Sequence, residues 1–211
     1  MSAATASRPA ATPLKLTWPR VLRSEWTKLW SLRSSVYTLL TSAVVMTGFG
    51  LIFAAAAQTA SPSRSGPSGA LDPATASLGG VYLAQLVIAV LGVLLISGEY
   101  STGSIRSTLA AVPARLPVLW AKGVVLTAVT LVLMAAAAVA AFLSGQAILS
   151  GKHLQTSLSD PGVLRAVLGA ALYLTVVALL GLGLGALLRH TAAAIGIAAG
   201  LLLVLPILSG L

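Results

Sequence analysis

Five long intervals of the sequence contain no Asp, Glu, Lys or Arg, and they constrain the fold more than any other feature. They cover residues 34–63, 73–98, 123–151, 166–188 and 190–211. A helix needs roughly 20 mostly apolar residues to cross a bilayer, so each interval is long enough to cross once. Only 8% of the chain is charged and its mean hydropathy is +0.98, whereas soluble domains are roughly a quarter charged. The sequence therefore predicts a membrane protein.

The same intervals favour helices over strands. Backbone groups inside hydrocarbon must satisfy their own hydrogen bonds, which leaves helices or closed barrels. The Ala, Leu and Gly runs lack the alternation that is typical of barrel strands. We predict an all-α polytopic protein with five spans near residues 36–57, 79–97, 118–149, 163–188 and 191–211. These spans form a transmembrane domain (34–211), preceded by a flexible cytoplasmic N-terminus (1–16) and an amphipathic helix (17–33).

The distribution of Lys and Arg predicts the orientation, because basic connecting segments stay on the cytoplasmic side. Ten basic residues fall on the side of the N-terminus and three on the other side. We therefore expect the N-terminus to be cytoplasmic. The formal net charge of +9 then reflects topology and contact with anionic headgroups, and no nucleic-acid partner is expected.

Residues 18–33 have the pattern of a helix that lies on the membrane surface. Trp26 and Trp30 fall on its apolar half together with Val21, Leu22, Leu29 and Leu32, so indole anchoring at headgroup depth is expected. Glu25 also lies in this apolar half. A carboxylate in that position needs a cation, which Lys28 or a base from another loop on the same side could supply.

The segment after the second span, GEYSTGSIRSTLAAVP (98–113), holds Glu99, one of only four acidic residues in the chain. We expect a turn at Gly98 and then a short helix over 101–112, which Pro113 ends. Glu99 would lie at the start of this helix, where the helix dipole favours a carboxylate. A merely solvated turn is the alternative.

The sequence does not favour catalysis or metal binding. The four acids and two histidines are dispersed over both sides of the membrane without metal-ligand spacing. GKH at 151–153 and GLGLG at 181–185 lack the spacing of nucleotide-binding loops. Gly181 with Gly185, and Gly196 with Gly200, are instead pairs of small residues that allow close helix packing. The span interiors carry no ionisable pair for ion coupling, so any transport would take its energy from elsewhere.

Two blocks, SEWTKLWSLRSSVYTLL (24–40) and GEYSTGSIRSTLAAVPARLPVLWAK (98–122), resemble the membrane subunit of bacterial type-2 ABC exporters. In that family the N-terminal amphipathic helix is an elbow, and the loop after the second span carries a coupling helix that docks on a separate ATPase. The resemblance assigns Trp26, Lys28 and Trp30 to the elbow. It assigns to the coupling region Glu99, Tyr100, Ser101, Thr102, Gly103, Ile105 and Arg106.

The resemblance also implies partners and a location. The chain would be a permease of the bacterial cytoplasmic membrane, not an enzyme, paired with a second copy or a related permease. ATP and Mg would bind the partner ATPase, and this chain would hold no cofactor or metal. Because the family has six spans, we expect another apolar segment after Leu211, packed beside Gly196 and Gly200. The alternative function is a membrane scaffold or immunity-type protein that transports nothing.

Overall fold

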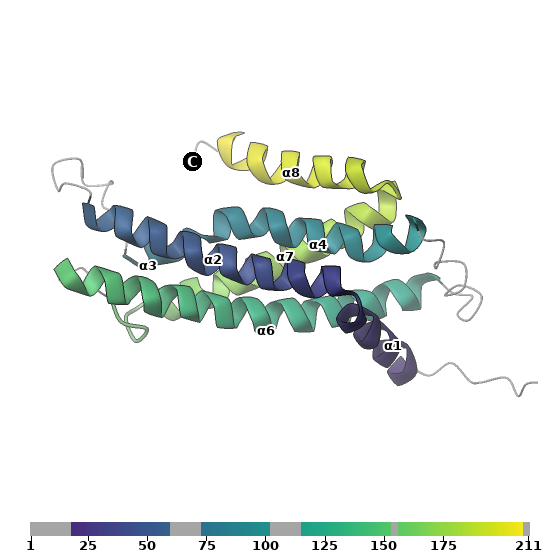
Figure 1. The fold of residues 1–211 in the computed structure, drawn as a ribbon, viewed down its shortest axis with the longest axis horizontal. Helices are drawn as coiled ribbons and strands as arrows, with labels where there is room; N and C mark the ends of the chain where they lie inside the picture. The colour runs from purple at the N-terminus through teal and green to yellow at the C-terminus, as the bar shows by residue number, and fades with distance from the viewer. Residues whose placement is uncertain (1–17, 60–72, 102–114, 153–155, 209–211) are drawn as a thin grey trace, which may run out of the picture.

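The computed structural model describes residues 18–59, 73–101, 115–152 and 156–208 (Figure 1). All regular structure in these segments is helical. The elements in chain order are α1 (Trp18–Ser31), α2 (Arg33–Thr59), α3 (Pro73–Ser77), α4 (Val81–Ser101), α6 (Arg115–Leu149), the 3₁₀ turn η2 (Ser150–Lys152), α7 (Val163–Leu188) and α8 (Thr191–Leu208).

Four long helices, α2, α4, α6 and α7, run alongside one another and form the body of the molecule (Figure 1). All four are long and apolar enough to cross a membrane, as the charge-free intervals predicted. The predicted count of five spans is not confirmed. Helix α8 has 18 residues, and its apolar stretch, Thr191–Val204, is about 21 Å long at 1.5 Å per residue, shorter than the other four.

The short helix α1 joins α2 at Leu32 and leans away from the bundle (Figure 1). Leu32 itself is not helical, although its carbonyl accepts the Ser35 N–H at 3.0 Å and its N–H donates to the Lys28 carbonyl at 3.2 Å. The predicted amphipathic helix at 17–33 is therefore present as a separate element. Its place on a membrane surface stays a prediction.

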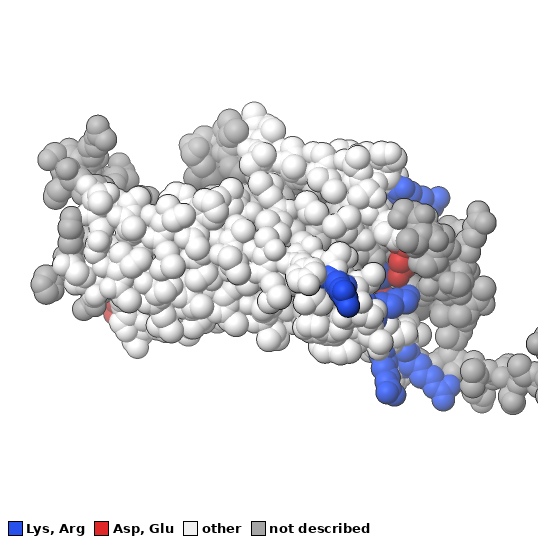
Figure 2. Space-filling view, viewed as in Figure 1, with Lys and Arg blue, Asp and Glu red and all other residues white. Residues whose placement is uncertain are grey.

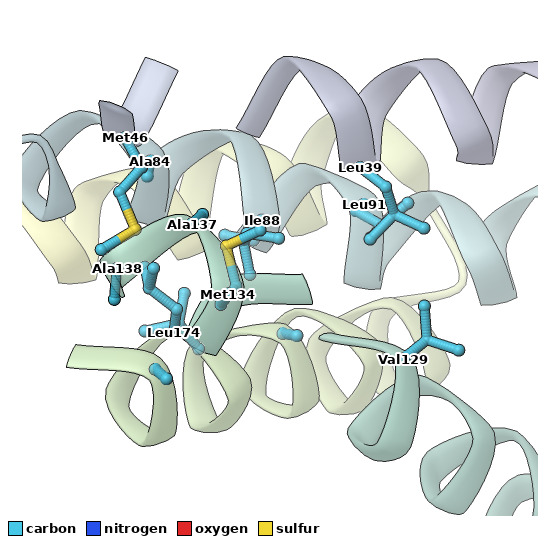
Figure 3. Packing of buried hydrophobic residues seen from close by; sticks show 14 of the residues in the cluster. Leu39, Met46, Ala84, Ile88, Leu91, Val129, Met134, Ala137, Ala138 and Leu174 are labelled. Atoms are coloured by element: carbon cyan, nitrogen blue, oxygen red, sulfur yellow. The ribbon is translucent and has the colours of Figure 1, made fainter. Parts of the chain in front are cut away.

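Apolar side chains from all four long helices meet in the centre of the bundle (Figure 3). Met46 of α2 and Met134 of α6 are fully buried, and Leu174 contributes from α7. Outward-facing apolar side chains on the same helices stay exposed, as hydrocarbon contact requires. Because lipid is as apolar as leucine, close packing and not water exclusion holds such helices together.

Glycines allow α4 and α7 to approach each other closely. A Cβ added to Gly92 would lie 2.1 Å from the Ala178 carbonyl oxygen, and one at Gly181 would lie 2.3 Å from the Ala89 carbonyl oxygen. Gly185 packs against Ile96 in the same way. The predicted packing role of Gly181 and Gly185 is thus confirmed. A Cβ at Gly196 or Gly200, in contrast, would have no described neighbour within 4 Å.

Charged side chains gather where α1 meets the bundle, and a long uncharged surface separates them from the other end (Figure 2). We call this the α1 end. It contains the last turn of α4, the first turns of α6 and the turn between α7 and α8. The basic residues whose side chains are described there are Arg20, Arg23, Lys28, Arg33, Lys122 and Arg189. The opposite end contains α3, η2 and Asp160.

Candidate functional site

Helix α1 turns a carboxylate toward the bundle. Glu25 and Leu29, one turn apart, are both buried, while Trp26 and Trp30 are half-exposed on the outer side. The two indole rings lie 5.9 Å apart with tilted planes. Leu29, from the predicted apolar half of α1, therefore packs on the bundle. The two indoles of the same half remain half-exposed.

Four charged side chains from three helices meet at this position. We call Glu25 and Lys28 of α1, Glu99 of α4 and Lys122 of α6 the four-charge cluster. Lys122 Nζ donates to Glu25 Oε2 at 2.6 Å and to Glu99 Oε1 at 3.0 Å. Lys28 Nζ donates to Glu25 Oε1 at 2.7 Å and to Glu99 Oε1 at 3.3 Å. Each carboxylate thus contacts both ammonium groups, which confirms the prediction that Glu25 needs a cation.

These contacts are charge-assisted hydrogen bonds, and three of the four side chains are largely buried, unlike those of a surface ion pair. The exposed side-chain fractions are 3% for Glu25, 6% for Lys122, 12% for Glu99 and 37% for Lys28. Ion pairs at exposed sites contribute little, but a buried charge that loses its partner carries a large desolvation penalty. The four side chains therefore fix the relative positions of α1, α4 and α6.

The electrostatics of α1 follow from this arrangement. Burial raises the pKa of Glu25, but the nearby charge and hydrogen bond of Lys122, with smaller contributions from Lys28, outweigh it and hold the pKa below its usual value. Burial lowers the pKa of Lys28, and the hydrogen bond and charge of Glu25, with help from Glu99, leave it raised overall. Both groups are consequently ionised at neutral pH.

The expected turn at Gly98 is wrong, because α4 continues through it to Ser101. Glu99 therefore lies in the last turn of a helix, where the helix dipole disfavours a carboxylate. One glycine costs a helix only about 1 kcal/mol relative to Ala, and the contacts of Glu99 with Lys122 and Lys28 hold this turn in place. Its other oxygen, Oε2, is buried and has no hydrogen-bond partner among the described residues.

A second contact holds the end of α4. The Arg189 guanidinium lies 5.9 Å from the centre of the Tyr100 ring, which is the geometry of a cation–π contact. Arg189 has a left-handed backbone (φ 52°) and its N–H caps α7 by donating to the Gly185 carbonyl at 3.1 Å. The turn between α7 and α8 is thereby connected to the residue that follows Glu99.

The predicted coupling residues divide into two groups. Glu99, Tyr100 and Ser101 form the end of α4, whereas Thr102, Gly103, Ile105 and Arg106 lie outside the described residues, as does the expected short helix. Of the predicted elbow residues, Lys28 belongs to the four-charge cluster. The sequence-based prediction allowed for a base from another loop on the same side, but it did not identify Lys122, which lies within the predicted span 118–149.

A cavity of about 520 Å³ lies beside the four-charge cluster. Residues of α1, α2, α4 and α6 line it: Glu25, Lys28, Leu29, Ser31, Leu32, Ser34, Ser35, Thr38, Leu91, Leu94, Leu95, Gly98, Glu99, Lys122 and Val125. Within the described segments, no group of three His, Cys, Asp or Glu side chains could hold a metal ion. The site therefore offers ion pairs and an adjoining cavity, and its described part contains no cluster of metal ligands.

Comparison with known proteins gives one match. The family model described as ABC-2 family transporter protein matches residues 21–206, which include most of α1, the four long helices and most of α8. No curated protein and no solved structure matches the chain. The matched region covers most of the sequence, including every member of the four-charge cluster. The chain therefore belongs to the ABC-2 transporter family and is a multi-pass membrane permease of that family.

Proposed function

We propose that this permease is the membrane-spanning subunit of an ATP-driven exporter, and that a separate nucleotide-binding subunit drives it through residues 102–114. Two copies, or one copy with a related permease, would form the path. ATP and Mg²⁺ would bind the ATPase subunit. The α1 end would face the cytoplasm of a bacterial cell, in agreement with the excess of basic residues there.

The observation that carries this proposal is the Glu99–Lys122 ion pair. Glu99 lies in the last turn of α4, before residues 102–114, and Lys122 lies in the first turns of α6, after them. The 3.0 Å contact joins the two helices that lead into and out of this segment. A partner that pushes on the segment would therefore act on α4 and α6 together, because the buried ion pair resists their separation.

Helix α1 extends the same connection. Glu25 contacts Lys122, and Lys28 contacts Glu99, so α1 contacts both helices that flank residues 102–114. Leu32 then joins α1 to α2, the first membrane-spanning helix. A displacement at residues 102–114 would reach three of the four long helices through these contacts.

An external energy source agrees with the composition of the spans. Ion-coupled transporters keep ionisable side chains at membrane depth, whereas the five charge-free intervals of this chain contain no Asp, Glu, Lys or Arg. ATP hydrolysis on a separate subunit supplies the energy in the proposed mechanism. The charges of the four-charge cluster lie at the α1 end, where a cytoplasmic partner could act on them.

The test is purification of the full chain from native membranes in a mild detergent. We expect a P-loop ATPase to co-purify, and Arg106→Glu or Ile105→Asp to reduce its recovery while membrane insertion is unchanged. Arg165→Glu, an exposed change at the opposite end, is the matched control. A permease that purifies without any ATPase would contradict the proposal and favour the scaffold or immunity-type alternative.

A further inference from the structure

The cavity beside the four-charge cluster has the size and position of a ligand site. Its volume of about 520 Å³ falls within the range of about 300–1,000 Å³ that is common for small-molecule sites. It lies at the junction of α1 with α2 and reaches α4 and α6. Half-exposed Leu32 and Leu94 line it, so it is open to the surroundings of the bundle.

The walls of the cavity divide into an apolar and a polar part. Leu91, Leu94 and Leu95 have the i, i+3, i+4 spacing of one face of α4, and Leu29 lines the cavity from α1. The polar part consists of the four-charge cluster and of hydroxyl groups from the α1–α2 junction, including Ser34. A molecule that fills the whole cavity must therefore combine a polar head with an apolar chain.

The charges indicate what kind of head fits. Two carboxylates and two ammonium groups line the cavity, so the cluster has no net charge. Lys28 donates two hydrogen bonds to described residues, Glu25 and Glu99, and its side chain is 37% exposed. An ammonium group can make three such bonds, so one N–H remains that could bind a phosphate oxygen.

The carboxylates disfavour a purely anionic head. Glu25 and Glu99 both line the cavity, and Glu99 is 12% exposed. A second anion beside them would be repelled unless it brought its own cation. A head that carries both a phosphate and an ammonium group matches a neutral cluster with both signs on its surface.

We propose that this cavity binds one zwitterionic phospholipid with a primary ammonium head, of the phosphatidylethanolamine class, taken from the leaflet at the α1 end. Lys28 and Ser34 bind its phosphate, and Glu99, the more exposed of the two carboxylates, binds its ammonium group. One acyl chain lies along Leu91, Leu94 and Leu95. The proposal depends on membrane embedding and not on the ATPase partner.

The experiment uses the full-length permease in nanodiscs that contain phosphatidylethanolamine and phosphatidylglycerol in roughly equal amounts. A trace of phosphatidylethanolamine carries a photoactivatable group on one acyl chain. After illumination and proteolysis, we expect crosslinked peptides from α4 around Leu94. Native mass spectrometry of the detergent-extracted protein should show one retained phosphatidylethanolamine.

Two matched variants on α2 decide the outcome. Thr38→Phe fills the cavity from its wall, and Leu40→Phe adds apolar surface at a half-exposed position that does not line it. We expect Thr38→Phe to reduce crosslinking to α4 and lipid retention by about tenfold, and Leu40→Phe to leave both unchanged. ATPase co-purification should be the same for both variants, so failure here is distinct from failure of the proposed function.

Three results would overturn the inference. Equal retention in the two variants would place the lipid elsewhere on the bundle. Equal retention of phosphatidylglycerol and phosphatidylethanolamine would show nonspecific annular lipid. Crosslinks confined to outward-facing residues of α2 and α7, with none on α4 around Leu94, would show that the cavity holds no acyl chain.

Discussion

The two ends of the helical bundle are held together by different chemistry. At the α1 end, two carboxylates and two ammonium groups connect α1, α4 and α6. At the opposite end, the neutral amide of Gln146 in α6 connects α3 to the segment before α7. Its nitrogen donates to the Ser77 hydroxyl at 3.1 Å and to the Pro73 carbonyl at 3.3 Å, and its oxygen accepts the Thr156 N–H at 2.8 Å.

The difference shows which end of the bundle is sensitive to pH and salt. Neutral hydrogen bonds act at short range, and protons or salt barely change them. Charge-assisted bonds are stronger and act over longer distances, and they depend on the protonation of each member. The amide end is therefore expected to be insensitive to pH and salt, whereas the stability of the charged end depends on both. Four predictions test this comparison.

The largest effect is expected at the α1 end from Lys122→Met. This change leaves Glu25 and Glu99 buried with Lys28 alone, and removal of one partner from a buried ion pair costs about 3–5 kcal/mol. Thermal unfolding of the detergent-solubilised protein measures the loss. Glu25→Gln combined with Lys122→Met removes charge in a matched pair and should recover part of the stability; no recovery would mean that the charges are uncoupled.

A smaller effect is expected at the opposite end from Gln146→Leu. The variant leaves the Thr156 N–H and the Ser77 hydroxyl without this partner, which costs about 1–3 kcal/mol for unsatisfied groups. Ser144→Ala is the control, because that partly buried hydroxyl bonds only to carbonyls of its own helix among the described residues. A loss for Gln146→Leu as large as that for Lys122→Met would remove the distinction between the ends.

The pH dependence of stability should come from the α1 end. The pKa of Glu25 is lowered from 4.5 in the folded protein, so its stabilisation is present above about pH 4.5 and is lost as the pH falls through the folded value. The pKa of Lys28 is raised from 10.5, so its stabilisation is present below about pH 10.5 and is lost as the pH rises through the folded value. Thermal unfolding midpoints of wild type and Glu25→Gln, measured across this pH range, test both losses of stability. If the midpoints of the two proteins fell equally at acid pH, the account would be contradicted.

The smallest effect is expected from Asp160→Asn. Bonds from the Thr156 hydroxyl at 2.6 Å and the Ser157 N–H at 2.7 Å lower the pKa of Asp160, but the side chain is fully exposed. Water can replace these bonds, so global stability should not change. Hydrogen exchange at the Ser157 amide should become faster, and a large drop in the unfolding midpoint would show that this turn supports the bundle.

Much of this architecture could be predicted from the sequence, for physical reasons that apply to particular segments. Charge-free length indicated α2, α4, α6 and α7, because a bilayer leaves a long apolar run few alternatives to a helix. The position of Glu25 among apolar residues indicated a cationic partner. The identity of Lys122 as that partner depends on how α1 and α6 pack, which periodicity within one helix does not specify.

The continuation of α4 past Gly98 was missed for a related reason. A glycine within a helix costs about 1 kcal/mol relative to Ala, which is a local effect. The ion pairs of Glu99 with Lys122 and Lys28 outweigh this cost here. Helix-end predictions near charges are therefore sensitive to partners that lie far away in sequence. The Arg189–Tyr100 contact depends in the same way on the packing of α7 against α4.

The central claim is that the four-charge cluster carries force from the ATPase contact to the helices. The most direct measurement is permease-dependent ATP hydrolysis of the co-purified complex with charges reversed at all four positions: Glu25→Lys, Lys28→Glu, Glu99→Lys and Lys122→Glu. This variant preserves every opposite-charge contact, whereas Glu99→Lys alone places like charges together. We predict that the single reversal abolishes coupled hydrolysis and that the fourfold reversal restores a substantial part. Full activity in the single reversal, with the protein correctly inserted, would contradict the account.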